Sequence, residues 1–175
     1  MQLKTVTLDD LRKADNIDEL LSSMTDPLKQ VDLSLLRGHL DKVRKNIEFN
    51  RNMDRVAVLS LAAQDFISEL LPYIVRLYSN CQTETKKQKG LAFLEGYEDY
   101  CSARDIKPTD SAKKAYVDID EDSIASAKKE AATKALFTYL TNRYQDMDNC
   151  HNYAKKMLGF DKAAEIKASE PRDID

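Results

Sequence analysis

The stretch VAVLSLAAQDFISELLPY, residues 56–73, repeats its apolar side chains at alternating steps of three and four residues. This spacing places them on one face of an α-helix and predicts a seam of the coiled-coil type. The members of this predicted seam are Val56, Leu59, Ala63, Phe66, Leu70 and Tyr73. We therefore expect a long amphipathic helix that buries this face against another helix.

Two further stretches follow the same rule. The earlier one comprises Leu36, Leu40, Val43 and Ile47, and the later one comprises Phe137, Leu140, Tyr144, Met147, His151, Ala154 and Leu158. We expect helix from about Leu28 onward for some fifty residues, with a kink at Pro72. Within it, NIEFNRNMDR (residues 46–55) is polar and out of phase. It is either a break between two helices or a phase shift within one.

Local signals predict where several helices begin. Thr7 and Asp10 have the spacing of a capping box, and Val6 and Leu11 that of a hydrophobic staple. Asp26 before Pro27 is a second helix start.

Other signals predict breaks later in the chain. The polar segment SNCQTETKKQKG, residues 79–90, is expected to end the helix that carries the seam at residues 56–73. Residues 91–105 are expected to form a short helix or irregular hairpin. Lys107 and Pro108 mark another boundary. The last long helix is expected from about Ser123 to Leu158, with Gly159 as its C-terminal cap.

The composition favours an all-α protein of long antiparallel helices. Of its 175 residues, 33% are charged, four are Gly and four are Pro, and so few helix breakers are typical of helical proteins. Seams of this length bury poorly in a small monomer, which indicates a helical-bundle oligomer. We expect a short helical extension at 1–26, an elongated helical domain at 27–158, and a short helix with a disordered acidic tail at 159–175.

Charge and cysteine content limit the function. The 27 basic and 30 acidic residues leave a net charge of −3, so nucleic-acid binding would require a local basic stripe. Three isolated cysteines suit a reducing compartment. The chain lacks a secretion signal and any uncharged run of membrane-spanning length, so we expect a cytoplasmic location (the host cytoplasm if viral) and no membrane partner.

The sequence shows no pattern typical of an enzyme or of a cofactor site. It has no glycine-rich phosphate loop, no His-x-x-x-His pair and no nucleophile elbow. A hydrolase or nuclease would need a carboxylate cluster that the spacing does not provide. His151 lies on a seam, which predicts a hydrogen-bonded core residue, whereas His39 is expected at the surface. We expect no catalytic residue and no cofactor.

One acidic stretch resembles the start of a calcium loop. Asp118, Asp120 and Asp122 alternate as in an EF-hand, which also needs Gly at position 6 and Glu at position 12. Those positions hold Ser123 and Lys129, and a lysine repels a cation. We therefore expect no metal, and predict that Asp120 or Asp122 caps the last helix.

Basic residues interleaved with aromatic ones form the candidate site. Such a pattern suits single-stranded nucleic acid, because cations follow the phosphates while rings stack on bases. The candidate binding residues are Lys86, Lys87, Lys89, Phe93, Lys113 and Lys114. The alternative is the solvated lysine face of an ordinary helical protein, which composition alone favours.

A family resemblance favours the nucleic-acid interpretation. KQKGLAFLEG (residues 87–96) and the segment 108–157 together resemble the C-terminal two-thirds of the UvsY-like phage recombination mediators, over roughly residues 86–158. The shared features are a K-x-K-x-L-x-F-L-x-G element, a second stretch carrying Ser111, Lys114, Asp120 and Asp122, and a long helix after it. The first eighty residues match only as amphipathic helix.

The resemblance implies a function and its partners. It implies a homo-oligomer, ring-like in form, that binds single-stranded DNA and helps load a RecA-type recombinase onto DNA covered by single-strand-binding protein. The family's two DNA-binding basic positions fall on Gln88 and Gly90 in an ungapped comparison, so we expect the neighbouring lysines, Lys86, Lys87 and Lys89, to act as a cluster. The alternative is a structural or adaptor helical bundle, such as a phage assembly or regulatory factor, without DNA affinity.

Overall fold

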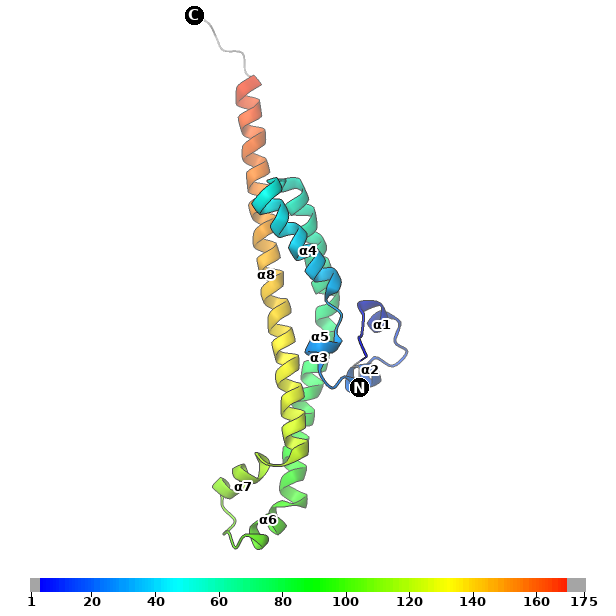
Figure 1. Cartoon of the computed structure of the whole chain (residues 1–175), viewed down its shortest axis with the longest axis vertical. Coiled ribbons are helices and arrows are strands. Elements are labelled where there is room, and N and C mark those ends of the chain that lie inside the picture. The colour runs from blue at the N-terminus through cyan, green and yellow to red at the C-terminus, as the bar shows by residue number, and fades with distance from the viewer. Residues whose placement is uncertain (1–3, 170–175) are drawn as a thin grey trace, which may run out of the picture. The chain divides into compact units, whose positions relative to one another are not determined.

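The computed structural model describes residues 4–169, with residues 160, 161 and 163–169 in backbone only, and this range contains helices but no strand (Figure 1). The predicted all-α class is confirmed. The helices form two compact units. Unit 1 comprises residues 4–32 and 71–139, and unit 2 comprises residues 33–70 and 140–169. Two long helices, α5 (Met53–Glu95) and α8 (Glu121–Ser169), contribute to both units.

In unit 1 the second part of α5 runs antiparallel to the first part of α8. The rings of Tyr78 and Phe137 stack with their centroids 6.2 Å apart. Further along α5, Cys81 Sγ lies 3.6 Å from Thr133 Oγ1. Residue numbers rise along one helix as they fall along the other, so the predicted antiparallel arrangement is confirmed here.

Unit 2 repeats this arrangement with the other halves of the two helices. Gln64 Nε2 donates to Asp148 Oδ1 at 3.3 Å. His151 Nδ1 lies 3.0 Å from the Ala57 carbonyl oxygen. A carbonyl can only accept, so Nδ1 carries the proton. His151 is therefore hydrogen-bonded, as predicted, but it is half-buried.

Helix α4 (Ser34–Lys45), also in unit 2, leads into a π-helix, η1 (Asn46–Asn50). Arg51 follows in the left-handed conformation, with φ of 50°, before α5 begins at Met53. NIEFNRNMDR thus contains a break between two helices, which was one of the two alternatives. The predicted fifty-residue helix from Leu28 is wrong, because α3 (Pro27–Gln30) ends after four residues.

The N-terminal segment of unit 1 folds into α1 (Leu8–Lys13), α2 (Ile17–Ser23) and α3. The capping box is confirmed: the Asp10 amide donates to Thr7 Oγ1 at 3.1 Å, and the Thr7 amide donates to Asp10 Oδ2 at 2.8 Å. Val6 and Leu11, the predicted staple, are both buried. Pro27 is the first residue of α3, as predicted, but the Asp26 side chain makes no capping bond.

Replacing Thr7 by alanine tests the capping box. We expect the free energy of unfolding to fall by about 1 kcal/mol, the usual loss for a missing N-cap, as measured by urea denaturation at neutral pH. Hydrogen bonds from the Thr7 amide and hydroxyl lower the pKa of Asp10 below 3.8. The stabilisation is therefore present above that pH and lost as the pH falls through the lowered pKa. Thr5→Ala, at an exposed position outside the box, should change neither the free energy of unfolding nor the pKa of Asp10.

Two predicted helix ends are wrong. Residues 79–90 form no link, because α5 continues through them to Glu95. Cys81 and Thr85 are buried there, and this burial outweighs the weak helix preference of a polar segment. Likewise α8 continues through Gly159 to Ser169. Of the predicted short helix and tail at 159–175, residues 159–169 belong to α8, and the rest lies outside the described residues.

The shorter helices of unit 1 begin at local signals. After Gly96 come α6 (Tyr97–Ala103) and α7 (Asp110–Val117). Thr109 Oγ1 caps α7 by accepting from the Ala112 amide at 3.2 Å, which confirms the boundary after Pro108. Asp120 Oδ2 accepts from the Ser123 amide at 2.8 Å. Asp120, one of the two predicted candidates, is therefore the N-cap of α8.

The buried face of α5 follows a seam close to the predicted one. Its buried members are Val56, Ser60, Ala63, Gln64, Phe66, Ile67, Leu70, Ile74, Leu77, Cys81, Thr85 and Ala92. Leu59 and Tyr73, which were predicted on this face, are only half-buried. By length and apolar composition, α5 is also the one helix within residues 4–169 that could cross a membrane, a property that it shares with core helices of helical bundles.

Candidate nucleic-acid interface

The predicted lysines lie on the second part of α5, where it enters a small lobe of unit 1. We call residues 86–120, which contain the end of α5, α6 and α7, the α6–α7 lobe. Lys86, Lys87 and Lys89 are all exposed. Because α5 is continuous here, Lys86, Lys89 and Phe93 follow one another at steps of three and four residues and share one face of the helix.

Lys87 points away from that face and has its own partner. Its Nζ lies 3.9 Å from Glu84 Oε2, with both side chains largely in solvent. Exposed pairs at this spacing contribute little to stability, and salt screens them. Lys87 is therefore available to a ligand only in competition with Glu84.

The structure brings Phe93 and Lys113 into direct contact. Lys113 Nζ, from α7, lies 3.5 Å from the centroid of the Phe93 ring. The same ring also contacts Tyr97, with centroids 5.1 Å apart. One ring face of Phe93 is thus covered by an ammonium group, an arrangement held by the attraction of the cation to the ring. Phe93 therefore positions Lys113 instead of offering a free stacking surface.

An aromatic cluster supports this contact. The Tyr116 ring lies 5.0 Å from that of Tyr100 and 6.2 Å from that of Tyr97, and Tyr97 Oη donates to the Thr109 carbonyl at 2.9 Å. Burial raises the pKa of Tyr97 above its ordinary value. A second cation, the Arg104 guanidinium, lies 4.3 Å from the Tyr100 centroid. Sequence reasoning missed Arg104, although its position one helical turn after Tyr100 was a usable signal.

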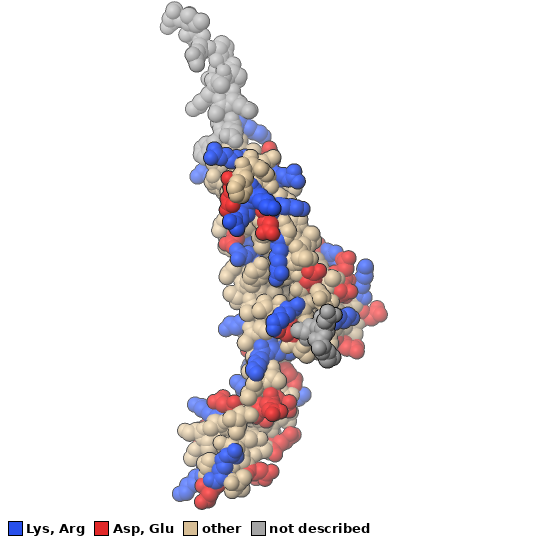
Figure 2. All heavy atoms as spheres, in the orientation of Figure 1, with Lys and Arg blue, Asp and Glu red and all other residues tan. Residues whose placement is uncertain are grey.

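Lys114 is exposed, and no described interaction joins it to Phe93 or to the lysines of α5. The α6–α7 lobe as a whole is not basic. It holds seven basic and seven acidic residues, and the two signs are interspersed over its visible face in Figure 2. Nucleic-acid binding here would depend on the stripe Lys86–Lys89–Phe93 with Lys113, because the lobe has no excess of positive charge.

The lobe also contains an open pocket of about 540 Å³. Its apolar wall includes Phe93, Leu94, Tyr97, Ile106 and Pro108, and its polar rim includes Glu98 and Asp105. Leu94 is 76% exposed. The pocket shares Phe93 with the stripe, but its acidic rim disfavours phosphates, so the pocket itself does not suit nucleic acid.

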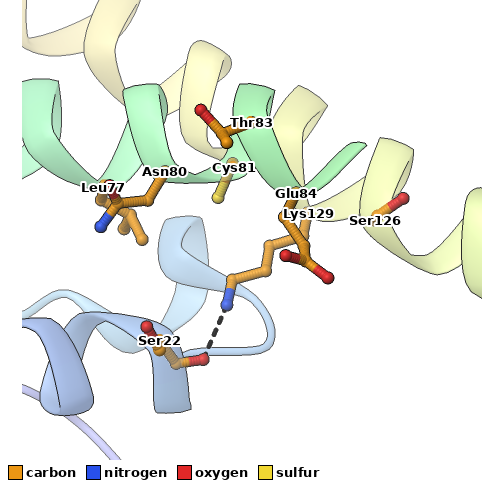
Figure 3. A pocket seen from close by; sticks show the side chains of 8 residues that line it. All are labelled: Ser22, Leu77, Asn80, Cys81, Thr83, Glu84, Ser126 and Lys129. Carbon is orange, nitrogen blue, oxygen red and sulfur yellow. Dashed lines mark hydrogen bonds between the residues drawn. The ribbon is translucent and has the colours of Figure 1, made fainter. Parts of the chain in front are cut away.

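A second pocket, of about 520 Å³, lies between α2, α5 and α8 within unit 1 (Figure 3). Lys129 Nζ donates across it to the Ser22 carbonyl at 2.8 Å, and Figure 3 shows Glu84 and Cys81 on its α5 wall. Cys81 is buried and has Thr133, not a base, as its neighbour. This pocket therefore shows no nucleophile paired with a base, and Lys129 joins the N-terminal helices to the long ones.

Other titratable groups assemble no site. Among the side chains that the structure describes, no three His, Cys, Asp or Glu residues come close enough to hold a metal ion. His39, predicted at the surface, is half-buried in unit 2, and burial lowers its pKa below 6.5. Burial raises the pKa of Cys150, which keeps its thiol protonated.

Comparison of the chain with protein-family models, with curated proteins and with solved structures finds no match.

Proposed function

We propose that this chain is a non-enzymatic mediator of recombination, which binds single-stranded DNA and assists the loading of a RecA-type recombinase onto DNA covered by single-strand-binding protein. The observation that carries the proposal is the stripe on α5, where Lys86, Lys89 and Phe93 share a face and Phe93 holds Lys113 at 3.5 Å. The resemblance of residues 86–158 to the UvsY-like mediators supports the same function.

The stripe can supply binding without base specificity. Its lysines interact with phosphates, which every sequence presents alike, and the released counterions make the affinity fall with salt. Lys113 adds a cation whose position is fixed by the Phe93 ring. This fixed position lowers the entropy that the side chain loses when it binds a phosphate.

Each protomer offers only a weak site, because the lobe has as many acidic as basic residues. A homo-oligomer, ring-like in form, would present several stripes to one strand, and linked weak contacts add up to strong binding. A strand held this way can be released stepwise as a recombinase takes it over. Weak individual contacts therefore suit a mediator, which must bind DNA and then give it up.

A triple substitution tests the site. In Lys86→Ala, Lys87→Ala, Lys89→Ala we expect the affinity for a labelled oligothymidine to fall about tenfold, as measured by fluorescence anisotropy at low salt. The slope of log affinity against log salt should become shallower by about 2, since each lost single-strand phosphate contact removes roughly 0.7.

The matched control removes three exposed lysines of α8 instead, namely Lys128, Lys134 and Lys155. This control changes the net charge by the same amount as the first triple variant but leaves the stripe in place. It should therefore retain most of the affinity. Equal losses in both triple variants would show that binding follows overall charge and would contradict the assigned stripe. Sedimentation of each protein ensures that the proteins compared are folded and in the same state of association.

A second function, that of an adaptor helical bundle without DNA affinity, is favoured by one observation. The lobe pocket of about 540 Å³ combines exposed apolar residues with an acidic rim, which suits a protein partner better than DNA. If folded wild-type protein fails to bind the oligonucleotide even at low salt, the mediator proposal is wrong and the adaptor function stands.

A further inference from the structure

The connection between α4 and α5, in unit 2, gathers positive charge that the stripe on α5 does not use. We call residues 42–55 the hairpin tip. It contains five basic residues, Lys42, Arg44, Lys45, Arg51 and Arg55, against the acidic Glu48 and Asp54. Arg44 Nε donates to Glu48 Oε1 at 2.9 Å. In Figure 2, Lys and Arg side chains lie over this part of the molecule with some Asp and Glu among them.

A network around Asn46 holds the backbone of the tip. Asn46, only 6% exposed, donates through Nδ2 to the Lys42 carbonyl at 2.8 Å. Its own carbonyl accepts from the amides of Arg51 and Asn52, and its Oδ1 accepts from Asn50 Nδ2 at 3.3 Å. The tip is therefore fixed by specific hydrogen bonds, not merely a stretch between helices.

This backbone is uncommon in two respects. The turn η1 is a π-helix, and π-helices are rare and concentrate at functional sites. Arg51 has a φ of 50°, a conformation that residues other than glycine adopt only at a cost in free energy. Asn52 Oδ1 then accepts from the Arg55 amide at 3.0 Å and starts α5. Strain retained in an ordered turn is a reason to look for a function there.

Phe49 is the large apolar side chain that this turn presents to solvent, and it is 77% exposed. It is the most exposed of the large hydrophobic side chains within the described residues. In contrast to Phe93, no described cation or ring covers Phe49. An open ring among cations, on a fixed backbone, is what stacking on a nucleic-acid base requires.

We propose that the hairpin tip is a second contact for single-stranded nucleic acid, in which Phe49 stacks on a base while Arg51, Arg55 and Lys45 bind the flanking phosphates. Lys45 lies about one turn before Phe49, and Arg51 two residues after it, so cations stand on both sides of the ring along the chain. This inference rests on the proposed function, because it assigns a second site to the same ligand.

Two other occupants fit the tip less well. A stable protein interface needs about 800 Å² per partner with a buried apolar centre, whereas the tip offers a single exposed ring among charges. Insertion into a membrane surface needs a helix face with several large apolar residues, and Phe49 is the one large apolar residue that η1 exposes. The excess of positive charge, absent from the α6–α7 lobe, favours phosphates.

The chain contains no tryptophan, which makes Phe49→Trp a specific reporter. We expect oligothymidine to quench the fluorescence of this variant, because a stacked base quenches an indole. Tyr144→Trp, at an exposed aromatic position elsewhere in unit 2 (38% exposed), is the control and should change little. Quenching of the first variant but not of the second would support the contact.

Affinity gives an independent readout. Phe49→Ala should weaken binding of oligothymidine by about 5- to 150-fold, the range expected for one lost base–aromatic stack, while Phe49→Tyr should retain most of the affinity. Val58→Ala, which truncates another highly exposed apolar residue of unit 2 (68% exposed), should leave affinity unchanged.

The outcomes separate the two proposals. If wild-type protein binds but Phe49→Trp is not quenched and Phe49→Ala binds normally, the tip contact is wrong while the proposed function stands. If wild-type protein does not bind at all, both are wrong. If Phe49→Trp shifts to the blue with phosphatidylglycerol vesicles and is not quenched by DNA, the tip is a membrane contact and the inference is overturned.

Discussion

Replacing Ile74 by alanine is expected to lower the free energy of unfolding by about 2–5 kcal/mol, the range for truncating a large aliphatic side chain in a core. Ile74 lies on the buried seam of α5 in unit 1 and has no exposed surface. Truncation removes apolar contacts and leaves a cavity that the two long helices, fixed by their other contacts, close only in part. Urea denaturation followed by circular dichroism at 222 nm measures the loss.

The neighbouring residue supplies the control. Val75 is 49% exposed, and alanine is the better helix former. Val75→Ala should therefore change the free energy of unfolding by no more than about 0.5 kcal/mol in either direction. If both substitutions cost the same, the buried face of α5 lies elsewhere and the seam described above is wrong.

The sequence predicted this seam to within one residue, and the remaining error has a physical cause. Tyr73 was placed on the buried face and Ile74 was not, yet Ile74 is buried and Tyr73 half-buried. Adjacent apolar residues at 66 and 67 and at 73 and 74 allow two helical registers of similar hydrophobicity. Which register is used depends on the partner helix, a tertiary contact that periodicity does not contain.

Helix starts were predicted better than helix ends. The side chains of Thr7 and Asp120 cap their helices by accepting from backbone amides three residues ahead, so the signal is local and readable in the sequence. Gly159 and the polar residues 79–90 looked like ends but lie inside α8 and α5. A glycine costs a helix only about 1 kcal/mol, which continued packing on either side can offset.

At the candidate site, too, the sequence predicted local features but not the contacts between helices. The lysines and aromatic residues could be selected by type and spacing, but treating residues 79–90 as a link concealed that Lys86, Lys89 and Phe93 share a helix face. The contact of Lys113 with Phe93 joins residues twenty positions apart in the chain, so no local pattern predicts it. The stretch at 46–55 was predicted to be either a break or a phase shift, whereas the exposure of Phe49 follows from the π-turn and needed the structure.

Replacing Gly96 by alanine should disrupt the aromatic cluster of the α6–α7 lobe. An added Cβ would overlap the Tyr116 hydroxyl and lie 2.9 Å from Tyr116 Cζ. The ring must then leave its contacts with Tyr97 and Tyr100. We expect a loss of about 1–3 kcal/mol, typical of an overpacked site, together with a weaker near-ultraviolet circular dichroism signal. That signal reports on the tyrosines, because the chain has no tryptophan.

Gly90, six residues earlier in α5, provides a control of opposite sign. A Cβ there meets no atom within 4 Å, and the position is inside a helix. Gly90→Ala should therefore raise the free energy of unfolding by about 0.5–1 kcal/mol, because alanine loses less backbone entropy on folding. If Gly96→Ala instead matches wild type in stability and in its near-ultraviolet spectrum, Tyr116 does not pack on Gly96. The lobe that positions Lys113 against Phe93 would then have to be assembled differently.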